Sequence, residues 1–230
     1  MIVSLTIVRY KKWQTFFALL AMAIHRIPMS MQKGCTFWKL LGTGRNGQMS
    51  LKPDWQQWGI LAVWDSEDDF QAFYNHSFIA SWWQFFGVEW WTILCEPLQS
   101  HGKWNGKEPF GSAVMKGYEG PIVVLTRATV KYSKFRQFWS SVKTVQSQLY
   151  VAKGFIMSVG IGELYSLPAT FSIWNNLEDM KAYAYAGGEH ADVIKRARNE
   201  SWLSEDLFAR FKPVASFGTI NGKDPLNGVI

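Results

Sequence analysis

The 230-residue chain alternates between two patterns of hydrophobic and polar positions. Short apolar runs indicate β-strands, and between them lie segments whose apolar residues return every three or four positions, as on one face of a helix. The pattern predicts strands at about 2–10, 36–43, 57–64, 91–98, 122–131, 154–162, 168–174 and 208–217. It predicts helices at about 11–31, 66–87, 133–150 and 177–203, the last interrupted by Gly187 and Gly188. The order strand, helix, strand, strand, helix, strand therefore occurs twice.

The two halves also resemble each other in sequence. Four pairs of blocks match in the same order, namely VRYKKW with VKYSKF, FWKLLGTG with FIMSVGIG, LAVW with FSIW, and NGKEPF with NGKDPL. We interpret the chain as two tandem ferredoxin-like repeats, residues 1–110 and 121–226, joined by a linker at 111–120. The open face of each sheet needs a cover. We therefore expect an α+β fold in which the two sheets form a dimeric α/β-barrel-like pseudo-dimer with the helices outside.

The apolar segment 16–24 has two interpretations. It could be the hydrophobic region of a signal peptide, but it is too short to span a bilayer and it follows a predicted strand. A helix stripe of the same kind recurs in the second half, which favours a folded helix with its stripe in the core. The two predicted core stripes are Trp13, Phe16, Phe17 and Leu20 in the first half, and Phe135, Phe138, Trp139 and Val142 in the second.

Composition narrows the choice of function. The chain has 13 Trp, 16 Phe and 8 Tyr, which is an unusual capacity to line an apolar pocket or to hold a planar ligand. Its net charge of +6 suits an anionic surface, either a membrane or a nucleic acid. Cys35 and Cys95 have no metal-binding spacing, so we expect buried thiols and a reducing, cytoplasmic location.

Standard catalytic motifs are absent from the sequence. It has no nucleophile elbow, no P-loop, no dinucleotide-binding glycine motif after a strand, no HExxH and no EF-hand loop. No two of the four histidines have close metal-ligand spacing, but heme needs only one. His190 follows the glycine pair, beside the one sizeable insertion that distinguishes the halves. It is the candidate heme ligand; the alternative is a solvated residue at a helix start.

Two charges stand inside apolar strands. Arg127 occupies the position that Leu5 holds in the first half, and a charge there needs a partner or a pocket. We hold two interpretations, a functional site or a structural residue that faces water or pairs with a carboxylate such as Glu163. Lys39 poses the same question. We expect Glu205 to be a structural or surface residue.

A cluster of tryptophans lies in the first half only. Trp82, Trp83, Trp90 and Trp91 have no aromatic counterparts in the second half. The simpler interpretation is a helix buried against the sheet. The alternative is a surface that receives a long apolar ligand or touches lipid.

Five blocks of the sequence resemble the spheroidene monooxygenases, the carotenoid 2-oxygenases of acyclic carotenoid pathways. They are FWKLLGTG at 37–44, LTRAT at 125–129, GIGE at 160–163, TFSIW at 170–174 and FARF at 208–211. The resemblance implies oxygen insertion at C2 of a linear carotenoid, using dioxygen, reducing equivalents and a heme. This family often has tyrosine where this chain has Phe208, so a proton-transfer role for that phenol is not expected here.

The sequence also resembles, at the level of fold, dimeric α/β-barrel heme proteins such as chlorite dismutases and aldoxime dehydratases. In those proteins a histidine of the C-terminal repeat binds iron, which implies that His190 is the metal ligand of heme b. The resemblance also implies that Phe171 and Trp174 line the cofactor. Arg127, with Lys39, would hydrogen-bond the bound oxygen.

The resemblance implies three kinds of partner: a hydrophobic, carotenoid-like substrate, an electron-donor protein, and the inner membrane as a peripheral contact. A homo-oligomer is left open. Two alternatives keep the heme: an enzyme with dehydratase, peroxidase-like or N–O chemistry, and a non-enzymatic heme- or carotenoid-binding module. Nucleic-acid binding is disfavoured, because the aromatic residues fall mostly on helix stripes and no long basic run occurs.

Overall fold

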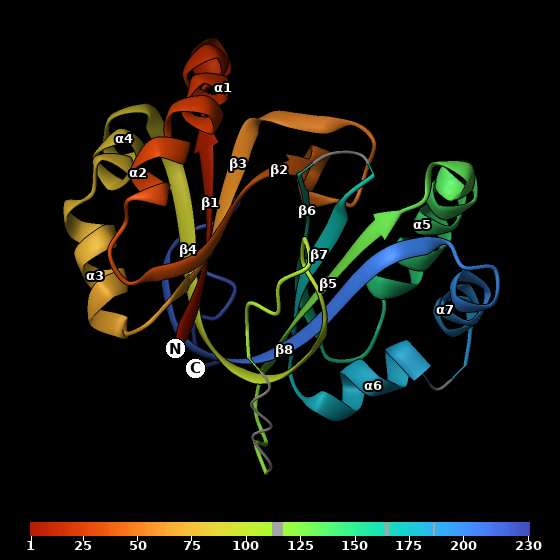
Figure 1. Ribbon diagram of the computed structural model, residues 1–230. Coiled ribbons are helices and arrows are strands. Elements are labelled where there is room, and N and C mark those ends of the chain that lie inside the picture. Colours follow the sequence, from red (N-terminus) through yellow and green to blue (C-terminus); the bar gives the residue numbers. More distant parts are fainter. Residues whose placement is uncertain (112–116, 164–165, 186) are drawn as a thin grey trace.

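The computed structural model describes residues 1–111, 117–163, 166–185 and 187–230, so half of the expected linker at 111–120, namely 112–116, lies outside the described residues. Eight antiparallel strands form a closed barrel, and the helices lie outside it in two groups, α1–α4 on one side and α5–α7 on the other (Figure 1). The predicted mixed fold of helices and antiparallel strands is confirmed.

The bounds of the elements follow the predicted order. The strands are β1 (Ile2–Tyr10), β2 (Cys35–Gly44), β3 (Pro53–Trp64), β4 (Gly87–Gly102), β5 (Ile122–Val130), β6 (Phe155–Gly162), β7 (Pro168–Trp174) and β8 (Leu203–Gly218). The helices are α1 (Thr15–Ile24), α2 (Arg26–Ser30), α3 (Glu67–His76), α4 (Phe78–Phe86), α5 (Phe135–Leu149), α6 (Leu177–Tyr185) and α7 (Glu189–Asn199). Short 3₁₀ turns occur at Lys12–Gln14, Arg45–Gly47 and Tyr132–Lys134.

The strand order is β1-β3-β2-β6-β7-β5-β8-β4, and β4 pairs with β1 to close the ring. Each half contributes four neighbouring strands, so the halves meet at two seams. The β4–β8 seam is long and runs from Trp91 to Gly102 on β4. At the β2–β6 seam only Gly42 and Thr43 pair, with Gly162 and Ile161.

Several predicted bounds were wrong in a consistent way. Strands β4 and β8 begin four or five residues before the predicted starts at 91 and 208, because residues 87–90 and 203–206 are half-buried or exposed and form no buried apolar run that would mark a strand. The predicted helix at 66–87 is two helices. Ser77 has an extended backbone and its hydroxyl accepts a hydrogen bond from the Ala80 N–H, so it ends α3 and caps α4. The break that we expected at the glycine pair separates α6 from α7.

Alternate residues on each strand point into the barrel or away from it. On β5, Val123 and Leu125 belong to the cluster that fills the barrel, whereas Ile122 and Val124 pack outside under the helices of the second half. Eight-stranded barrels are narrow enough for side chains to fill. Cys95 is buried in the interior cluster and Cys35 is half-buried; both are free thiols.

Helix α1 faces the barrel with the opposite side from the one we predicted. Trp13 and Phe16, expected in the core, are 73% and 68% exposed. The buried positions are instead Gln14, Ala18, Ala21 and His25. Small alanine side chains let α1 approach the sheet closely over β3, whose Ile60 and Ala62 belong to the same outer cluster as Ala18. That approach leaves Trp13 and Phe16 facing outward, while Phe17 and Leu20 of the predicted stripe are half-buried.

No helix among the described residues is both long enough and apolar enough to span a bilayer.

His25 gives this packing a pH dependence. Its ring is 3% exposed, its edge lies against Trp82 with ring centroids 5.5 Å apart, and its Nε2 has no hydrogen-bond partner. Burial lowers the pKa of His25 to about 4. The unfolded imidazole binds its proton near pH 6.5, so between these values the unfolded state holds more protons. Stability is therefore complete above pH 6.5 and is lost as pH falls toward 4.

We expect the free energy of unfolding to fall by up to about 3 kcal/mol across this window through His25. Urea unfolding of the wild type and of His25→Leu at several pH values from 7 to 4 measures it, because the variant lacks the titrating ring. Parallel pH profiles for the two proteins would contradict the prediction.

Candidate functional site

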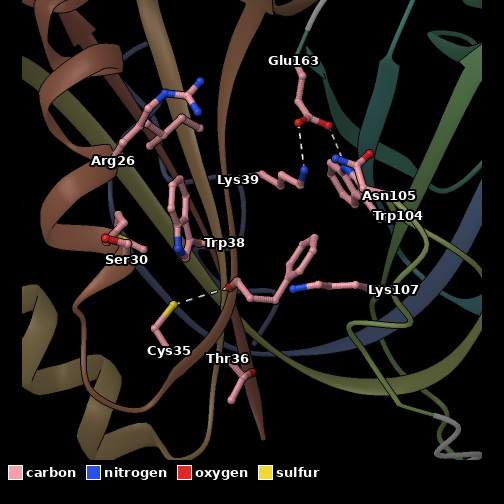
Figure 2. Close-up of a pocket in the computed structure, with 13 residues that line it drawn as sticks. Arg26, Ser30, Cys35, Thr36, Trp38, Lys39, Trp104, Asn105, Lys107 and Glu163 are labelled. Carbon is pink, nitrogen blue, oxygen red and sulfur yellow. Dashed lines mark hydrogen bonds and ion pairs between the residues drawn. The ribbon is translucent and has the colours of Figure 1, made fainter.

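A cavity of about 510 Å³ lies between α2 and the β2 side of the β2–β6 seam (Figure 2). Its volume falls within the range of small-molecule sites, about 300–1,000 Å³. Phe37, Trp38 and Trp104 supply aromatic wall, and Arg26, Lys39, Lys107 and Glu163 supply charge. Seven of the 13 lining residues are polar or charged, so the cavity combines an aromatic wall with a largely polar remainder.

Lys39 connects the two halves inside this cavity. Its Nζ donates to Glu163 Oε2 at 2.9 Å, and Trp104 Nε1 donates to Glu163 Oε1 at 2.7 Å. The ammonium also lies 5.8 Å from the centroid of the Trp104 ring and 5.7 Å from that of Phe37. The sequence therefore singled out a residue of the cavity, but Glu163 is the partner of Lys39 and not of Arg127.

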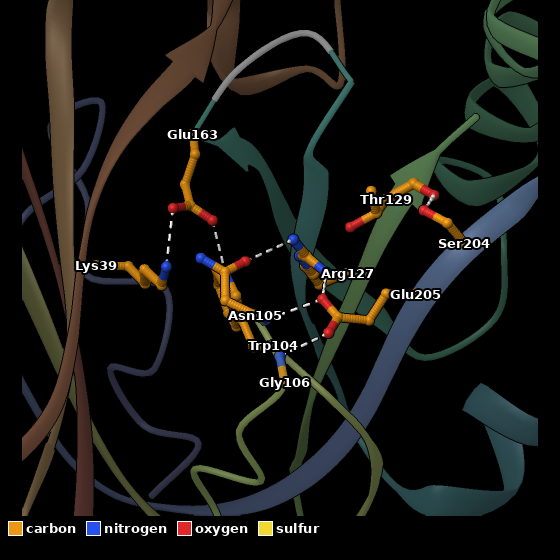
Figure 3. A network of polar contacts seen from close by, with 9 residues as sticks. All are labelled: Lys39, Trp104, Asn105, Gly106, Arg127, Thr129, Glu163, Ser204 and Glu205. Atoms are coloured by element: carbon orange, nitrogen blue, oxygen red, sulfur yellow. Dashed lines mark hydrogen bonds and ion pairs between the residues drawn. The ribbon is translucent and has the colours of Figure 1, made fainter. Parts of the chain in front are cut away.

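Arg127 lies inside the barrel and is 1% exposed. Its Nη1 forms an ion pair with Glu205, and its Nη2 donates to Asn105 Oδ1 at 3.2 Å (Figure 3). Its guanidinium carbon lies 5.6 Å from the Trp104 ring centroid, and its Nε has no partner. Arg127 and Lys39 thus meet on the two sides of Trp104, in one polar network that spans both halves.

Glu205 is a central member of this network and not a surface residue, with a side chain only 24% exposed. It accepts backbone N–H groups of Asn105 at 2.9 Å and Gly106 at 2.7 Å. Burial raises the pKa of Glu205, but these two donors and Arg127 outweigh it and hold the pKa below its usual range. Asn105 and Gly106 have φ of 52° and 75°, the left-handed geometry that points both N–H groups at one carboxylate.

The same clasp occurs a second time, with the halves exchanged. Glu89 of β4 accepts the Gly222 N–H at 2.6 Å and the Thr219 hydroxyl at 2.9 Å. No arginine joins it, because the residue equivalent to Arg127 is Leu5. The repeated NGK turns could have pointed to both glutamates from the sequence, since each turn is held by the other half.

His190 lies on the other side of the sheet. Its ring, at the start of α7, stacks on Tyr183 with centroids 4.8 Å apart, and Tyr183 contacts Trp174 at 5.2 Å. Burial lowers the pKa of His190 more than a hydrogen bond with the Ala184 backbone raises it, so the imidazole is neutral at neutral pH. Its Nδ1 is buried and has no hydrogen-bond partner by geometry. A neutral imidazole with an uncommitted nitrogen is the chemical form in which histidine ligates iron.

The sheet beside this histidine is left uncovered. Thr126, which faces outward in the middle of β5, is exposed, and its cross-strand neighbours are Thr170 and Phe208. Helix α5, which should cover it, has no buried residue, so the core stripe predicted for α5 is only half-buried. In the first half the equivalent residue, Ser4, is 3% exposed. The outer face of the sheet is therefore less covered at Thr126 than at Ser4.

The structure separates the predicted site residues into two sets. Arg127, Lys39 and Phe171 are inside the barrel or at its seam, whereas Trp174 and His190 are outside it. Because neighbouring residues of a strand point to opposite faces, Phe171 and Trp174 of one short strand lie on different sides. The structure does not bring Arg127 or Lys39 to His190.

The tryptophan cluster is mostly structural. Trp83 and Trp91 are 3% and 0% exposed, and Trp91 donates to Ser216 Oγ at 2.9 Å. Trp90 is half-buried and donates to the Tyr74 hydroxyl at 3.1 Å. For these three residues the simpler interpretation, packing against the sheet, describes the structure.

Solved structures resemble this fold without close sequence similarity. A crystal structure of an aldoxime dehydratase in complex with butyraldoxime superposes with a TM-score of 0.66 over 98% of this chain and 84% of that chain, at 10% sequence identity. A second aldoxime dehydratase structure gives a TM-score of 0.65. The chain is thus an α/β-barrel protein of the fold that aldoxime dehydratases also have.

Sequence comparison identifies the family. No family model matches the chain. A spheroidene monooxygenase of Cereibacter sphaeroides is 35% identical over 227 residues, which are 97% of this chain and 70% of that protein. A spheroidene monooxygenase of Rhodobacter capsulatus is 32% identical over 89% of this chain and 86% of that protein. The chain belongs to the spheroidene monooxygenase family, as the sequence blocks predicted.

The Arg127–Glu205 pair allows a stability test. Glu205→Gln leaves a buried guanidinium without an anion, and we expect a loss of about 3–5 kcal/mol in urea unfolding. Arg127→Leu introduces the residue of the equivalent position and leaves Glu205 with its two backbone donors, so it should cost less. Glu89→Gln is the matched control, because it weakens the second clasp without stranding a cation. Equal losses for Glu205→Gln and Glu89→Gln would argue against a structural charge pair.

Proposed function

We propose that this protein is a monooxygenase that transfers one oxygen atom from O2 to C2 of an acyclic carotenoid. The observation that carries the proposal is the 35% identity to a spheroidene monooxygenase over 97% of the chain. The aromatic cavity at the β2–β6 seam supports an apolar substrate. An extended carotenoid is much longer than this cavity, so the cavity would hold only a part of the molecule remote from C2, because the sheet separates the cavity from His190.

We propose heme b as the cofactor, with His190 as the residue that holds it. The support is the state of this side chain: half-buried, neutral, stacked on Tyr183, and with a buried Nδ1 that has no hydrogen-bond partner among the described residues. When bound, heme would supply dioxygen activation with electrons from an external donor protein. Among the described residues no cluster of three or more histidine, cysteine or acidic side chains could hold a metal ion, and a single-histidine heme needs none.

The walls for a flat ligand come from two elements. Helix α5 carries the half-buried Phe138 and Val142, and Thr126 and Thr170 offer hydroxyls on the outer side of the sheet. Trp174, packed against Tyr183, bounds the His190 end and keeps the candidate cofactor role that the sequence implied. Phe171 is part of the barrel interior, so in this proposal it supports the sheet and does not touch the cofactor.

Lys39 and Arg127 take roles at the cavity in this proposal. Lys39 lines the cavity and could contact the substrate. Arg127 acts through Asn105 and Trp104, both of which line the cavity, so it is a positioning residue. Their direct contact with oxygen at His190 is not part of the proposal, because the sheet lies between.

We also propose that residues 1–110 and 121–226 are tandem ferredoxin-like repeats. The support is the strand order within each half, β4-β1-β3-β2 and β8-β5-β7-β6, together with the matched sequence blocks and the reciprocal glutamate clasps. A circularly permuted chain that begins at residue 121 should then fold to the same barrel.

The activity is tested with purified, heme-supplemented protein, a reducing system, acyclic carotenoids and ¹⁸O2. We expect a product that carries one labelled oxygen at C2. Product labelled only from water, or no oxygenated product while aldoximes are dehydrated, would overturn the monooxygenase assignment.

The cofactor is tested by optical spectroscopy of the purified protein and two variants. We expect a Soret band in the wild type and in His76→Ala, an exposed histidine of the first half, and loss of most bound heme in His190→Ala. Circular dichroism shows whether the variants are folded. A folded His190→Ala protein with full heme content and an unchanged Soret band would exclude His190 as the ligand.

A further inference from the structure

Helix α1 presents an apolar side to solvent. Its exposed stripe continues from the preceding turn into α2 and beyond it. The members are Trp13, Phe16, Leu19, Ile27 and Met31, each between 42% and 79% exposed. A surface helix of a soluble protein normally presents its polar side, and here the polar residues Gln14 and His25 are on the buried side.

The stripe continues onto α4 through stacked rings. Phe16 contacts Phe17 at 5.6 Å, Phe17 stacks on Phe86 at 4.4 Å, and Phe86 contacts Phe85 at 4.7 Å between ring centroids. Phe85 is 78% exposed. Figure 1 shows α1, α2 and α4 on the same side of the barrel. We call this surface the α1/α4 face and define it by Trp13, Phe16, Leu19, Ile27, Phe85 and Val88.

The segment that builds α1 and α2 carries charge of one sign, whereas on the β4 side of the face Glu89 follows Val88. Residues 1–53 contain eight Lys and Arg and no Asp or Glu, whereas the other 177 residues contain 16 basic and 18 acidic side chains. All of the excess positive charge is thus in the segment that builds α1 and α2. Lys11 and Lys12 are exposed at the start of the stripe, and Arg26 and Lys33 are exposed near its end.

The second half lacks this arrangement. The fully exposed positions of α5 are polar, namely Arg136, Gln137, Ser140, Lys143, Thr144 and Ser147. The exposed apolar stripe is therefore not a requirement of the barrel fold. It belongs to the first half alone, on the side where the cavity opens.

We propose that the α1/α4 face docks the protein on an anionic lipid bilayer. Trp and Phe side chains would enter the interface, and the flanking Lys and Arg side chains would contact anionic headgroups. A symmetric dimer through this face would place Lys11, Lys12 and Arg26 near the same residues of a second copy. That charge repulsion favours lipid over self-association.

The cavity adjoins the α1/α4 face, so docking on a membrane would bring the cavity close to a substrate dissolved in lipid. Arg26, Met29 and Ser30 of α2 line it, and Ile27 of the same short helix is part of the α1/α4 face. A substrate dissolved in lipid could pass from the bilayer to the cavity beside α2 without crossing bulk water. This role of docking rests on the proposed carotenoid substrate, whereas lipid binding itself does not.

Sedimentation with vesicles tests the docking without any carotenoid. We expect the full-length protein to bind vesicles that contain phosphatidylglycerol, to bind pure phosphatidylcholine vesicles weakly, and to lose affinity as salt is raised. The exposed triple variant Phe16→Ser, Leu19→Ser, Ile27→Ser should bind at least about tenfold more weakly. Lys11→Glu with Lys12→Glu should weaken binding by about fivefold or more for each charge. The matched control is Tyr132→Ser with Val151→Ser, exposed residues of the second half, and it should bind like the wild type.

Brominated lipids locate the contact. We expect bromine on the upper acyl chain to quench part of the protein fluorescence, and Trp13→Phe to remove most of that quenching, because Trp13 is 73% exposed on the face. Circular dichroism confirms that each variant is folded.

Three results would overturn the proposal: equal binding to neutral and anionic vesicles, no effect of the triple variant, or a wild-type dimer that the triple variant converts to a monomer without any lipid binding. Vesicle binding without carotenoid oxygenation would instead remove the proposed function and keep the docking face. Oxygenation of detergent-dispersed carotenoid without vesicle binding would instead keep the proposed function and remove the docking face.

Discussion

Closure of the eight-stranded sheet assigns a side to every strand residue, and the rest of the molecule follows from that assignment. In a closed ring no residue can change sides without a bulge, because side chains alternate between the interior and the helices. The interior holds an apolar core with the buried Arg127 and its partly exposed partner Glu205. The exterior of the second half holds His190. The Arg127 network and the His190 side chain are thus separated by the thickness of a single sheet.

The order of strands and helices could be predicted from the sequence, because hydrophobic periodicity and the matched sequence blocks of the two halves mark it. The orientation of α1 could not. Periodicity locates a stripe on a helix but does not say which side meets the sheet, and an apolar stripe is normally assigned to the core. Here Ala18 and Ala21 decide the orientation, because their small side chains permit a close approach that Phe16 would prevent.

Some of the candidate residues could be identified from the sequence, because they interrupt a local pattern. Arg127 and Lys39 were conspicuous as charges within apolar strands, and both lie in the buried network. Their partners were not evident, since Glu205 is 78 positions from Arg127 and Glu163 is 124 positions from Lys39. His190 stood out in the sequence because it lies beside the insertion that distinguishes the second half. Its stacking on Tyr183 depends on how α6 and α7 pack, which no local pattern encodes.

The unequal seams give the barrel a mechanical asymmetry. Strands β4 and β8 are joined along most of their length, whereas β2 and β6 meet through Gly42 and Thr43 alone. Local opening costs least where the fewest backbone hydrogen bonds must break. The β4–β8 seam therefore acts as the hinge between the two halves, and the β2–β6 seam is the place where they can separate. Breathing at the β2–β6 seam would vary the width of the cavity while the β4–β8 seam stays intact, and amide hydrogens of β2 would exchange faster than those of β4.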